Sequence, residues 1–384
     1  MKEKFHLKAL SLFSNVGVAE AYFESLGVDV VIANELVEER AKFYMHLYPN
    51  TNMIVGDITN PVIYNEILES SLKAKIDLII ATPPCQGMSC AGLMDPCDPR
   101  NNLIYYAVEL IKKLEPKFVI LENVPNQMHT HINYLDTQIL IPEYVEKELS
   151  HIYKFNDKRI INTKDFGVPQ SRQRFIYLLS HKNTNIQWEF PSQERVITLR
   201  EAIGNLPSLD PNIRDEDKKN LFPNYESLKN EGLKVSKWHY PPIHSWKQVE
   251  WMMHTPSGKS AFSNEVFYPK KDNRRIKGAP RTYMRMDWGK PATTVMQNSG
   301  VISAFSTVHP GRPIIESDSD VKRIYSDARA LSIYELLIVS SLPPDWNIPE
   351  WASDTLIRKV IGEGIPPLLL KKAIDNLKKI YVCA

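Results

Sequence analysis

Residues 7 to 35 read LKALSLFSNVGVAEAYFESLGVDVVIANE, and this stretch decides the fold. It contains two β-rich apolar runs, 7–13 and 28–35, and between them an amphipathic run around 18–26 with helical spacing. A strand, a helix and a second strand in this order form the unit of a parallel sheet, because a parallel pair needs a long crossover. We therefore expect an α/β protein.

The same alternation continues through the first half of the chain. Further strands are expected at 52–57, 76–82 and 117–123. Further helices are expected at 37–47, 62–72, 103–114 and 138–150. Two more β-rich runs, 158–162 and 174–180, have no helical run between them, which favours an antiparallel pair at the sheet edge. The prediction is a doubly wound, Rossmann-like sheet of seven mostly parallel strands.

Composition fits a globular protein of two domains. The chain has 384 residues, of which 43% are hydrophobic and 24% charged, enough for a large core. No apolar run approaches the roughly 20 residues that span a bilayer, and the start lacks the hydrophobic stretch of a signal peptide, so we expect a cytoplasmic protein. The four cysteines form no CxxC pair, which argues against a disulfide framework. No metal site is expected, and His129 and His131 are interpreted as surface residues.

The net charge of +2 does not by itself indicate a partner, but the charge is unevenly distributed. Between Lys270 and Lys290 eight basic residues face only Asp272 and Asp287, which gives this segment a charge of +6. Such a cluster binds phosphates through Coulomb attraction and counterion release. The alternative interpretation of this charged segment is a solvated surface loop without a binding role.

Polar residues stand where the expected strands end, the edge at which open parallel sheets bind ligands. The first loop, SLFSNVGV, has one glycine, Gly17. Glu35 ends the second strand and is suited to accept hydrogen bonds from a ribose diol, while Asp57 follows the third and is suited to an adenine amino group. With Phe13 and Ile58 as apolar walls, these acids outline a nucleoside pocket.

The fourth strand runs into TPPCQG at 82–87, a cysteine behind two prolines. A lone cysteine is most often a small buried hydrophobe. Here Pro83 and Pro84 fix the backbone at the ligand edge of the sheet and hold the Cys85 side chain in place. A thiol is already a strong nucleophile as the thiolate, so this position favours a catalytic role for Cys85.

These residues resemble the DNA cytosine-C5 methyltransferases, which use S-adenosylmethionine. The resemblance runs through most of the chain in the family's usual order. It comprises the SLFSNVG loop, Glu35, GDI (56–58), PPCQ (83–86), RNNL (100–103), ENV (122–124), QSRQR (170–174), RALSIYELLIVSSLPPDW (329–346) and IGEGIPPLLLKKAI (361–374). PPCQ, ENV and QxRxR in this order are highly specific.

The resemblance implies a reaction. The Cys85 thiolate attacks carbon 6 of cytosine and makes carbon 5 nucleophilic, while a protonated Glu122 donates to N3. Arg172 and Arg174 suit the work of holding O2 and a flanking phosphate, with ordinary surface charge as the alternative. The base must first leave the duplex, and Gln86 and Ser89 lie on the loop expected to close around it.

The resemblance also implies the cofactor, the partners and the domains. S-adenosylmethionine is expected at the cavity formed by Phe13, Gly17, Glu35, Asp57, Ile58, Pro83 and Leu103. A class I methyltransferase domain is expected at 1–183 plus 355–384, with a smaller target-recognition domain at 184–354. Double-stranded DNA is the expected partner, with phosphate contacts from Lys270, Lys271, Arg274 and Arg275. The enzyme is expected to act as a monomer in a restriction-modification system, with a restriction endonuclease acting separately and no membrane contact.

Some positions depart from the family pattern. Ser11 stands where Asp is common, Asn15 and Val18 where Gly is common, and Glu363 where Asn is usual. All lie around the expected methionine end of the cofactor, so the geometry or affinity there is in question.

Three alternatives stay open at this point. An amino-group methyltransferase also has a Pro-Pro turn, but an aromatic residue follows it, and Cys85 stands in that place. A cytosine-C5 enzyme acting on tRNA shares the catalytic motifs. A non-catalytic DNA-binding relative has no need of Cys85, Glu122 and Arg174 together.

Overall fold

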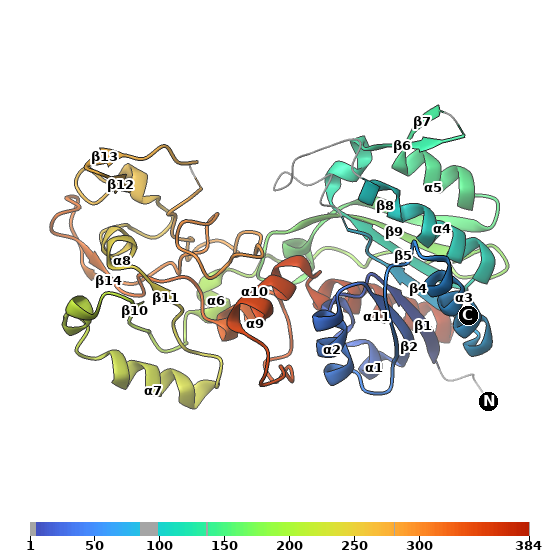
Figure 1. Ribbon diagram of the computed structural model, residues 1–384, viewed down its shortest axis with the longest axis horizontal. Helices are drawn as coiled ribbons and strands as arrows, with labels where there is room; N and C mark the ends of the chain where they lie inside the picture. The colour runs from blue at the N-terminus through green and yellow to red at the C-terminus, as the bar shows by residue number, and fades with distance from the viewer. Residues whose placement is uncertain (1–4, 85–98, 136, 280, 384) are drawn as a thin grey trace.

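The computed structural model describes residues 5–84, 99–135, 137–279 and 281–383, and its centre is a seven-stranded sheet (Figure 1). The strands are β1 Leu7–Leu12, β2 Val28–Glu35, β3 Asn52–Val55, β4 Leu78–Ala81, β5 Phe118–Asn123, β8 Tyr153–Asn162 and β9 Gln173–His181. Their order is β3-β2-β1-β4-β5-β9-β8, and only β9 pairs antiparallel with its neighbours, β5 and β8. The expected doubly wound sheet, with its antiparallel pair at one edge, is confirmed.

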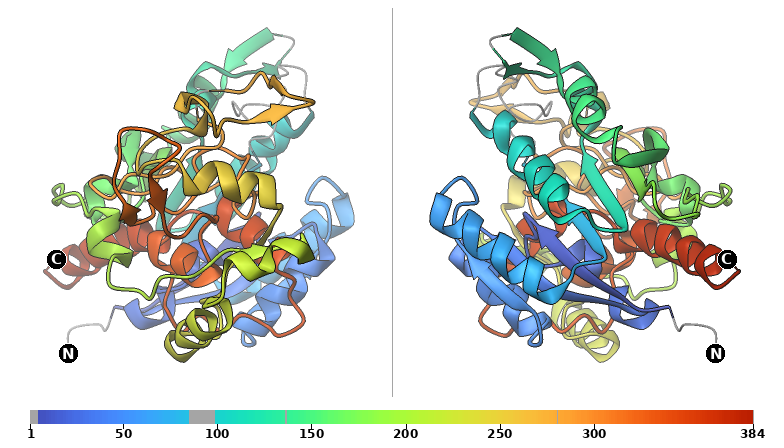
Figure 2. Two further views of the ribbon diagram at one scale, coloured as in Figure 1. Left: turned by 90° about the vertical axis from the view of Figure 1, so that its left-hand side faces the viewer. Right: turned by 90° about the vertical axis from the view of Figure 1, so that its right-hand side faces the viewer.

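Both faces of the sheet are covered, which explains why its inner strands β1, β4, β5 and β9 read as nearly continuous apolar runs. In β1, Leu10 and Leu12 point to one face and Leu7 and Ala9 to the other. The first face packs against α3 Pro61–Ala74, α4 Leu103–Leu114 and α5 Ile141–Leu149. The second packs against α1 Phe23–Leu26 and the terminal helix α11 Pro367–Cys383, which returns to the sheet part (Figure 2).

Two local predictions were wrong in extent. The helix expected around 18–26 is split into the 3₁₀ turn η1 Val18–Glu20 and the one-turn helix α1, and the left-handed residues Gly17 and Gly27 bound the whole segment. The helix expected at 138–150 starts only at Ile141. Residues before it form a hairpin of β6 His131–Tyr134 and β7 Thr137–Leu140, in which the β-rich TQIL pairs with HINY.

The remaining helices and turns connect these elements. Beside the sheet lie α2 Glu38–Leu47, η2 Pro99–Asn102, η3 Pro125–His129 and η4 Thr163–Phe166. The later region holds α6 Leu199–Ile203, η5 Glu216–Leu221, α7 Tyr225–Val235, α8 Trp246–Met253 and η6 Ala261–Ser263. Its strands are β10 Asn212–Ile213, β11 Ile243–His244, β12 Lys270–Lys271, β13 Arg274–Arg275, β14 Pro313–Ile315 and β15 Ile324–Tyr325, each pairing only within a two-stranded sheet.

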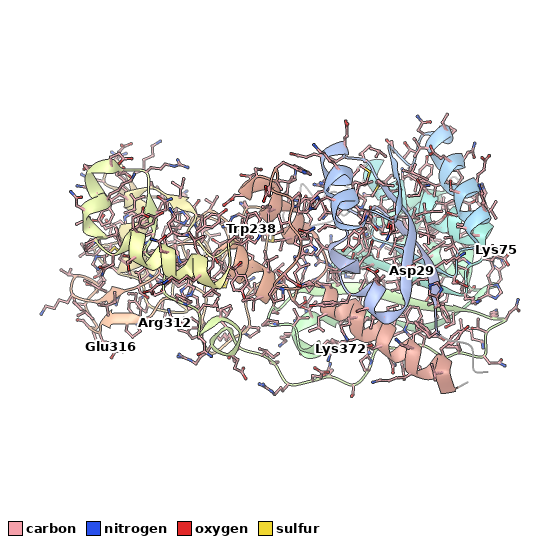
Figure 3. The ribbon with its side chains drawn as sticks, turned by 90° about the horizontal axis from the view of Figure 1, so that it is seen from below. Asp29, Lys75, Trp238, Arg312, Glu316 and Lys372 are labelled. Atoms are coloured by element: carbon pink, nitrogen blue, oxygen red, sulfur yellow. The ribbon has the colours of Figure 1, made fainter. Side chains whose placement is uncertain are left out.

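The later region therefore forms a second, smaller part with its own core, and it lacks the strand–helix alternation of the first part. Val249, Met252 and Trp251 of α8 pack there with Ile302 and Val308. Figure 3 shows Arg312 and Glu316 on this part, Lys372 of α11 on the sheet part and Trp238 between the two.

A third apolar cluster joins the two parts. It contains Val16 and Phe43 from the sheet part, Ile203 of α6, and residues of α9 Ile333–Val339 and α10 Asp354–Glu363. Trp188, just after position 183, packs on the sheet part and donates from Nε1 to the carbonyl of Ala373 at 2.9 Å. The expected domain limits stay a prediction.

A buried ionic cluster lies where the smaller part meets α9. Arg329 contacts Asp327 and Glu335, each at 2.8 Å, and all three side chains are inaccessible to solvent or nearly so. Asp327 also accepts from the backbone N–H of Leu209 at 2.9 Å. Within the described ranges, no helix is long and apolar enough to cross a membrane.

Candidate active site

A cavity of about 1650 Å³ opens at the carboxyl ends of the parallel strands. One wall comes from the loops after β1, β2, β3, β4 and β5 and from the start of β9. The opposite wall comes from 281–297 of the smaller part, and 359–365 closes one end. Residues far apart in the sequence thus face one space, as expected for a sheet of this topology.

The loop after β1 has an unusual backbone. Phe13, Asn15 and Gly17 all have positive φ, at 58°, 51° and 75°. The Thr82 hydroxyl donates to the carbonyl of Phe13 at 3.2 Å, which ties the loop to the end of β4. Phe13 lines the cavity, whereas Gly17 lies behind the loop against Tyr44 and Tyr48 and is absent from the cavity wall.

Glu35 and Asp57 lie on the cavity wall as the strand-end prediction requires. Glu35 is buried; one carboxylate oxygen accepts from the N–H of Asn15 and the other from that of Val37, each at 2.9 Å. Asp57 is exposed, and its Oδ1 accepts from the N–H of Thr59 at 2.9 Å. Each carboxylate keeps lone pairs beyond these bonds, so both can also accept from a ligand.

Three apolar residues complete this part of the wall. Ile58 is buried below Asp57, Pro83 follows β4, and Leu103 begins α4. Asn123 donates from Nδ2 to the carbonyl of Pro83 at 3.2 Å, which ties the turn after β4 to the end of β5. The structure therefore brings together every residue expected at the cofactor except Gly17, which shapes the loop from behind.

The residues that depart from the family pattern make contacts with other parts of the structure. Asn15 donates from Nδ2 to the carbonyl of Val360 at 3.1 Å, and Glu363 pairs with Arg40 at 2.7 Å. Burial raises the pKa of Glu363, although Arg40 opposes the shift. The Val18 side chain lies against Gly364.

A buried acid that the sequence reasoning missed lies beneath the same loop. Ser11 and Tyr44 both donate from their hydroxyls to the carboxyl group of Glu20. Burial raises the pKa of Glu20 to about 7. Arg40 on the cavity wall was missed too, because no local pattern links it to Glu363 so far along the chain.

Glu122 ends β5 on the cavity wall and pairs with Arg174 on the neighbouring strand β9. The carboxylate lies 2.6 Å from Nε of Arg174, and the two side chains are 8% and 11% exposed. Burial raises the pKa of Glu122, and the nearby charges of Arg174 and Arg172 only partly oppose this. The site thus holds a carboxyl group that binds a proton more readily than an exposed glutamate does.

Arg172 also lines the cavity, but its guanidinium group contacts backbone carbonyls. It donates to Val295 and Gly362, each at 2.9 Å, and to Glu363 at 3.2 Å. These contacts tie the residue before β9 to both the 281–297 wall and the end of α10. A direct role for Arg172 in the reaction stays a prediction.

Cys85, Gln86 and Ser89 lie outside the described residues. The described chain reaches Thr82, Pro83 and Pro84, and all three line the cavity. No group of three or more potential metal ligands occurs within the part of the chain that the structure describes.

The four basic residues expected at DNA phosphates form one exposed hairpin, β12–β13, away from the cavity wall. Asp272 and Asn273 at its turn have φ of 49° and 57°, as a two-residue turn of this kind requires. Arg275 donates to the carbonyls of Phe262 at 2.7 Å and Asn264 at 3.2 Å, so it also holds the hairpin in place. The cavity wall of the smaller part instead carries Arg281 and Lys290, which belong to the same basic 270–290 segment, and Gln297, which the sequence reasoning did not single out.

The sheet order and the acids at successive strand ends define the class I, Rossmann-like methyltransferase fold. A family model described as C-5 cytosine-specific DNA methylase matches residues 7–379, and the chain belongs to this family. The chain is 40% identical over 375 residues to Type II methyltransferase M1.HgaI of Avibacterium volantium, covering 96% of this chain and 97% of that protein.

Further relatives agree. Identity to Type II methyltransferase M1.HphI of Haemophilus parahaemolyticus is 26% over 379 residues, which covers 97% of this chain and 87% of that protein. The solved structure of methyltransferase EhMeth of Entamoeba histolytica has a TM-score of 0.61 at 14% identity, covering 97% of this chain and 98% of that one. DNMT2 of Spodoptera frugiperda has a TM-score of 0.58 at 16% identity, covering 98% and 99%. At these identities the two structures show the shared fold alone.

Family membership excludes the amino-group alternative, and the Type II relatives favour DNA over tRNA as the substrate. The chain is a DNA cytosine-C5 methyltransferase, not an amino-group methyltransferase.

Proposed function

We propose that this chain methylates carbon 5 of one cytosine within a specific sequence of duplex DNA, with Cys85 as the nucleophile. The observation that carries the proposal is the buried Glu122–Arg174 pair on the wall of a large cavity, immediately beside the turn that leads to Cys85. This pair can hold a proton next to a reacting base, which the reaction requires.

The Cys85 thiolate adds to carbon 6 of a flipped-out cytosine, forming a carbon–sulfur bond, while protonated Glu122 donates to N3. Carbon 5, now enamine-like, forms a bond to the methyl group of the sulfonium donor, whose methyl–sulfur bond would break and leave its electron pair on sulfur. A base then removes the proton from carbon 5, the returning electron pair expels the Cys85 thiolate and restores the aromatic ring, and Glu122 takes back the proton from N3.

Arg174 orients Glu122 in this scheme. Its Nε contacts one carboxylate oxygen, so the other oxygen is left to carry the proton toward N3. The rest of the Arg174 guanidinium group is suited to O2 of the cytosine. Arg172 is assigned a positioning role, since its contacts hold the segments around the cavity together.

S-adenosylmethionine, when bound, supplies an electrophilic methyl group on a sulfonium. Phe13, Glu35, Asp57, Ile58, Pro83 and Leu103 are the residues proposed to hold it. The site has an unsatisfied group that fits a polar ligand: Oδ1 of Asn15 accepts no hydrogen bond from a described residue although it is shielded from solvent. Glu35 would accept from the ribose diol and Asp57 from the adenine amino group.

Target recognition is assigned to the smaller part of the molecule, within 184–354. The 281–297 wall faces the cavity and the β12–β13 hairpin is suited to phosphates. We propose that the enzyme works in the cytoplasm as a monomer and protects DNA against a separately acting restriction endonuclease. The names of its relatives, which are Type II methyltransferases, support this assignment.

Covalent trapping of the enzyme on DNA tests the proposal directly. Fluorine at carbon 5 blocks the final proton loss, so the wild-type chain with S-adenosylmethionine and a target duplex containing 5-fluorocytosine should stay attached to DNA through denaturing electrophoresis. Cys85→Ser should form no adduct, since a hydroxyl is far less ionised than a thiol. Cys90→Ser and Cys97→Ser are the matched controls and should be trapped normally. Absence of a wild-type adduct on a confirmed substrate would contradict the mechanism.

A further inference from the structure

The β6–β7 hairpin is a rigid ribbon with one packed face and one exposed face. Residues directly opposite in an antiparallel pair share a face, so Ile132 and Ile139 lie on one side and Asn133 and Gln138 on the other. Ile132 is buried in the main core, with Ile139 packed against it. Asn133 and Gln138 are exposed.

Several contacts fix the ribbon on the sheet part. The Tyr105 hydroxyl of α4 donates to the backbone carbonyl of Asn133. Tyr134 donates to Glu148 at 2.5 Å, and its ring lies 5.4 Å from that of Tyr144. The N–H of Ile141 bonds to the carbonyl of Thr130 at 3.0 Å. The exposed side chains of the ribbon are therefore presented by a preorganised element and not by a loose loop.

The β6–β7 ribbon directly follows a segment of the chain that lines the cavity. Val124, Pro125, Asn126 and His129, in the segment that leads into β6, all line the cavity. The ribbon also lies on the same side of the molecule as the basic β12–β13 hairpin, one on each part (Figures 1 and 2). A duplex that delivers a base to the cavity from this side would run between the two hairpins.

We propose that the β6–β7 ribbon is a second DNA-recognition element, in which Asn133 and Gln138 read base pairs next to the target cytosine. This inference rests on the proposed function and adds a specificity-determining surface outside the 184–354 interval.

The chemistry of the exposed face favours base edges over phosphates. It carries His131, Asn133, Gln138 and Leu140 and no lysine or arginine. Asn and Gln amides pair bidentately with adenine N6 and N7 in the major groove, which admits a two-stranded ribbon. Neither amide makes a hydrogen bond to another described residue, so both are available. Opposite residues lie about 5 Å apart, so the pair spans neighbouring base pairs.

The test compares methylation of duplex libraries randomised on both sides of the target cytosine. In Asn133→Ala and Gln138→Ala, the preference for A·T at one or two adjacent positions should fall about tenfold or more, while preferences elsewhere in the motif stay as in the wild type. Both side chains are exposed, so the variants should fold, and equal thermal midpoints will check this.

Asn185→Ala and Gln187→Ala are matched controls. They remove exposed amides after the end of β9, at the edge of the sheet opposite the cavity, and should leave every preference unchanged. Wild-type preferences in both ribbon variants would overturn the inference. A uniform loss of affinity for all duplexes with a weaker salt dependence would also overturn it, because that result indicates phosphate contacts.

A measurement of DNA binding distinguishes failure of this inference from failure of the proposed function. If the wild-type chain forms no methylated cytosine, the proposed function fails, but the ratio of specific to non-specific duplex binding still decides the role of the ribbon. A ratio that is equal in the wild type and the ribbon variants contradicts the inference.

Discussion

Opposing electrostatic effects act on the carboxyl group of Glu122. Burial disfavours its charged form, while Arg174 and Arg172 favour it, and the balance leaves its pKa raised. A carboxyl group in this state can deliver a proton to N3 and take it back in the same cycle. The arginine at 2.6 Å keeps the carboxylate oriented in both protonation states.

Glu122→Gln should slow methyl transfer by about 10²- to 10⁴-fold, the usual contribution of a general acid. The protonated fraction of Glu122 falls as pH rises through its raised pKa, so the wild-type rate should decline on the alkaline side. That decline should vanish in the variant, which has no proton to lose. Single-turnover rates across pH measure both effects.

The control for this variant is Glu109→Gln on the exposed side of α4, which should react as the wild type does. A rate for Glu122→Gln within about twofold of wild type would remove Glu122 from the mechanism.

Gly17 shows how one backbone position can shape the loop after β1 without lining the cavity. Its φ is 75°, and an added Cβ would lie 2.3 Å from a ring carbon of Tyr48 and 2.9 Å from one of Tyr44. Gly17→Ala should therefore lower the free energy of unfolding by about 2 to 4 kcal/mol, from left-handed strain and overpacking together. Denaturant unfolding measures this.

Gly289→Ala is the matched control, since the nearest atom to its added Cβ lies at 3.5 Å, an ordinary contact. Equal stability of the two variants would show that the loop relaxes around the new methyl group.

At the scale of elements, the β12–β13 hairpin divides its four charges between two faces. Lys270 pairs across the hairpin with Arg275, and Lys271 pairs with Arg274. Arg275 lies 4.1 Å over the Tyr268 ring and donates to backbone carbonyls, so removing it would disturb structure as well as charge. Lys271 and Arg274 test charge alone.

The double variant Lys271→Gln and Arg274→Gln should weaken binding to all duplexes and reduce the slope of log affinity against log salt by about 1.8, if each side chain neutralises one phosphate. The methylated motif should stay the same. Fluorescence titration at several salt concentrations gives the slope. Lys229→Gln and Lys234→Gln on α7 remove the same charge elsewhere and should change it little. A changed motif with an unchanged slope would assign this hairpin to base reading.

The inner strands β1, β4, β5 and β9 were predictable from sequence because they are buried on both faces and carry nearly unbroken apolar runs. The β6–β7 hairpin was not, since its turn at Leu135 has no glycine and the TQIL run joins the helical pattern that follows. Glu35, Asp57 and Glu122 were predictable as site residues because parallel strands deliver their ends to one edge.

Contacts between segments far apart in the chain could not be predicted, because no local sequence pattern indicates them. The Arg40–Glu363 pair joins residues 323 positions apart, and Arg172 bonds to carbonyls 123 and 190 positions away. Only the assembled fold brings these groups together, so neither spacing nor periodicity could reveal them.

At the scale of the whole molecule, the Asp327–Arg329–Glu335 cluster joins the smaller part to α9, which packs with residues of the sheet part. Burial raises the pKa of Glu335, but Arg329 more than offsets this and lowers it to about 2. A carboxyl group with a lowered pKa stabilises the fold fully above its ordinary value of 4.5 and loses this effect as pH falls toward about 2.

Arg329→Met should lower the free energy of unfolding by about 3 to 5 kcal/mol near neutral pH, because two buried carboxylates lose their shared partner. Since the cluster lies between the two parts, calorimetry should also separate one unfolding transition into two, with the smaller part melting first. The difference from the wild type should shrink as pH falls toward about 2, where Glu335 of the wild type begins to take up a proton as well. Arg195→Met, which removes the exposed partner of Glu201, should melt as the wild type does. A single transition with an unchanged midpoint in Arg329→Met would show that apolar packing around α9 couples the two parts without this cluster.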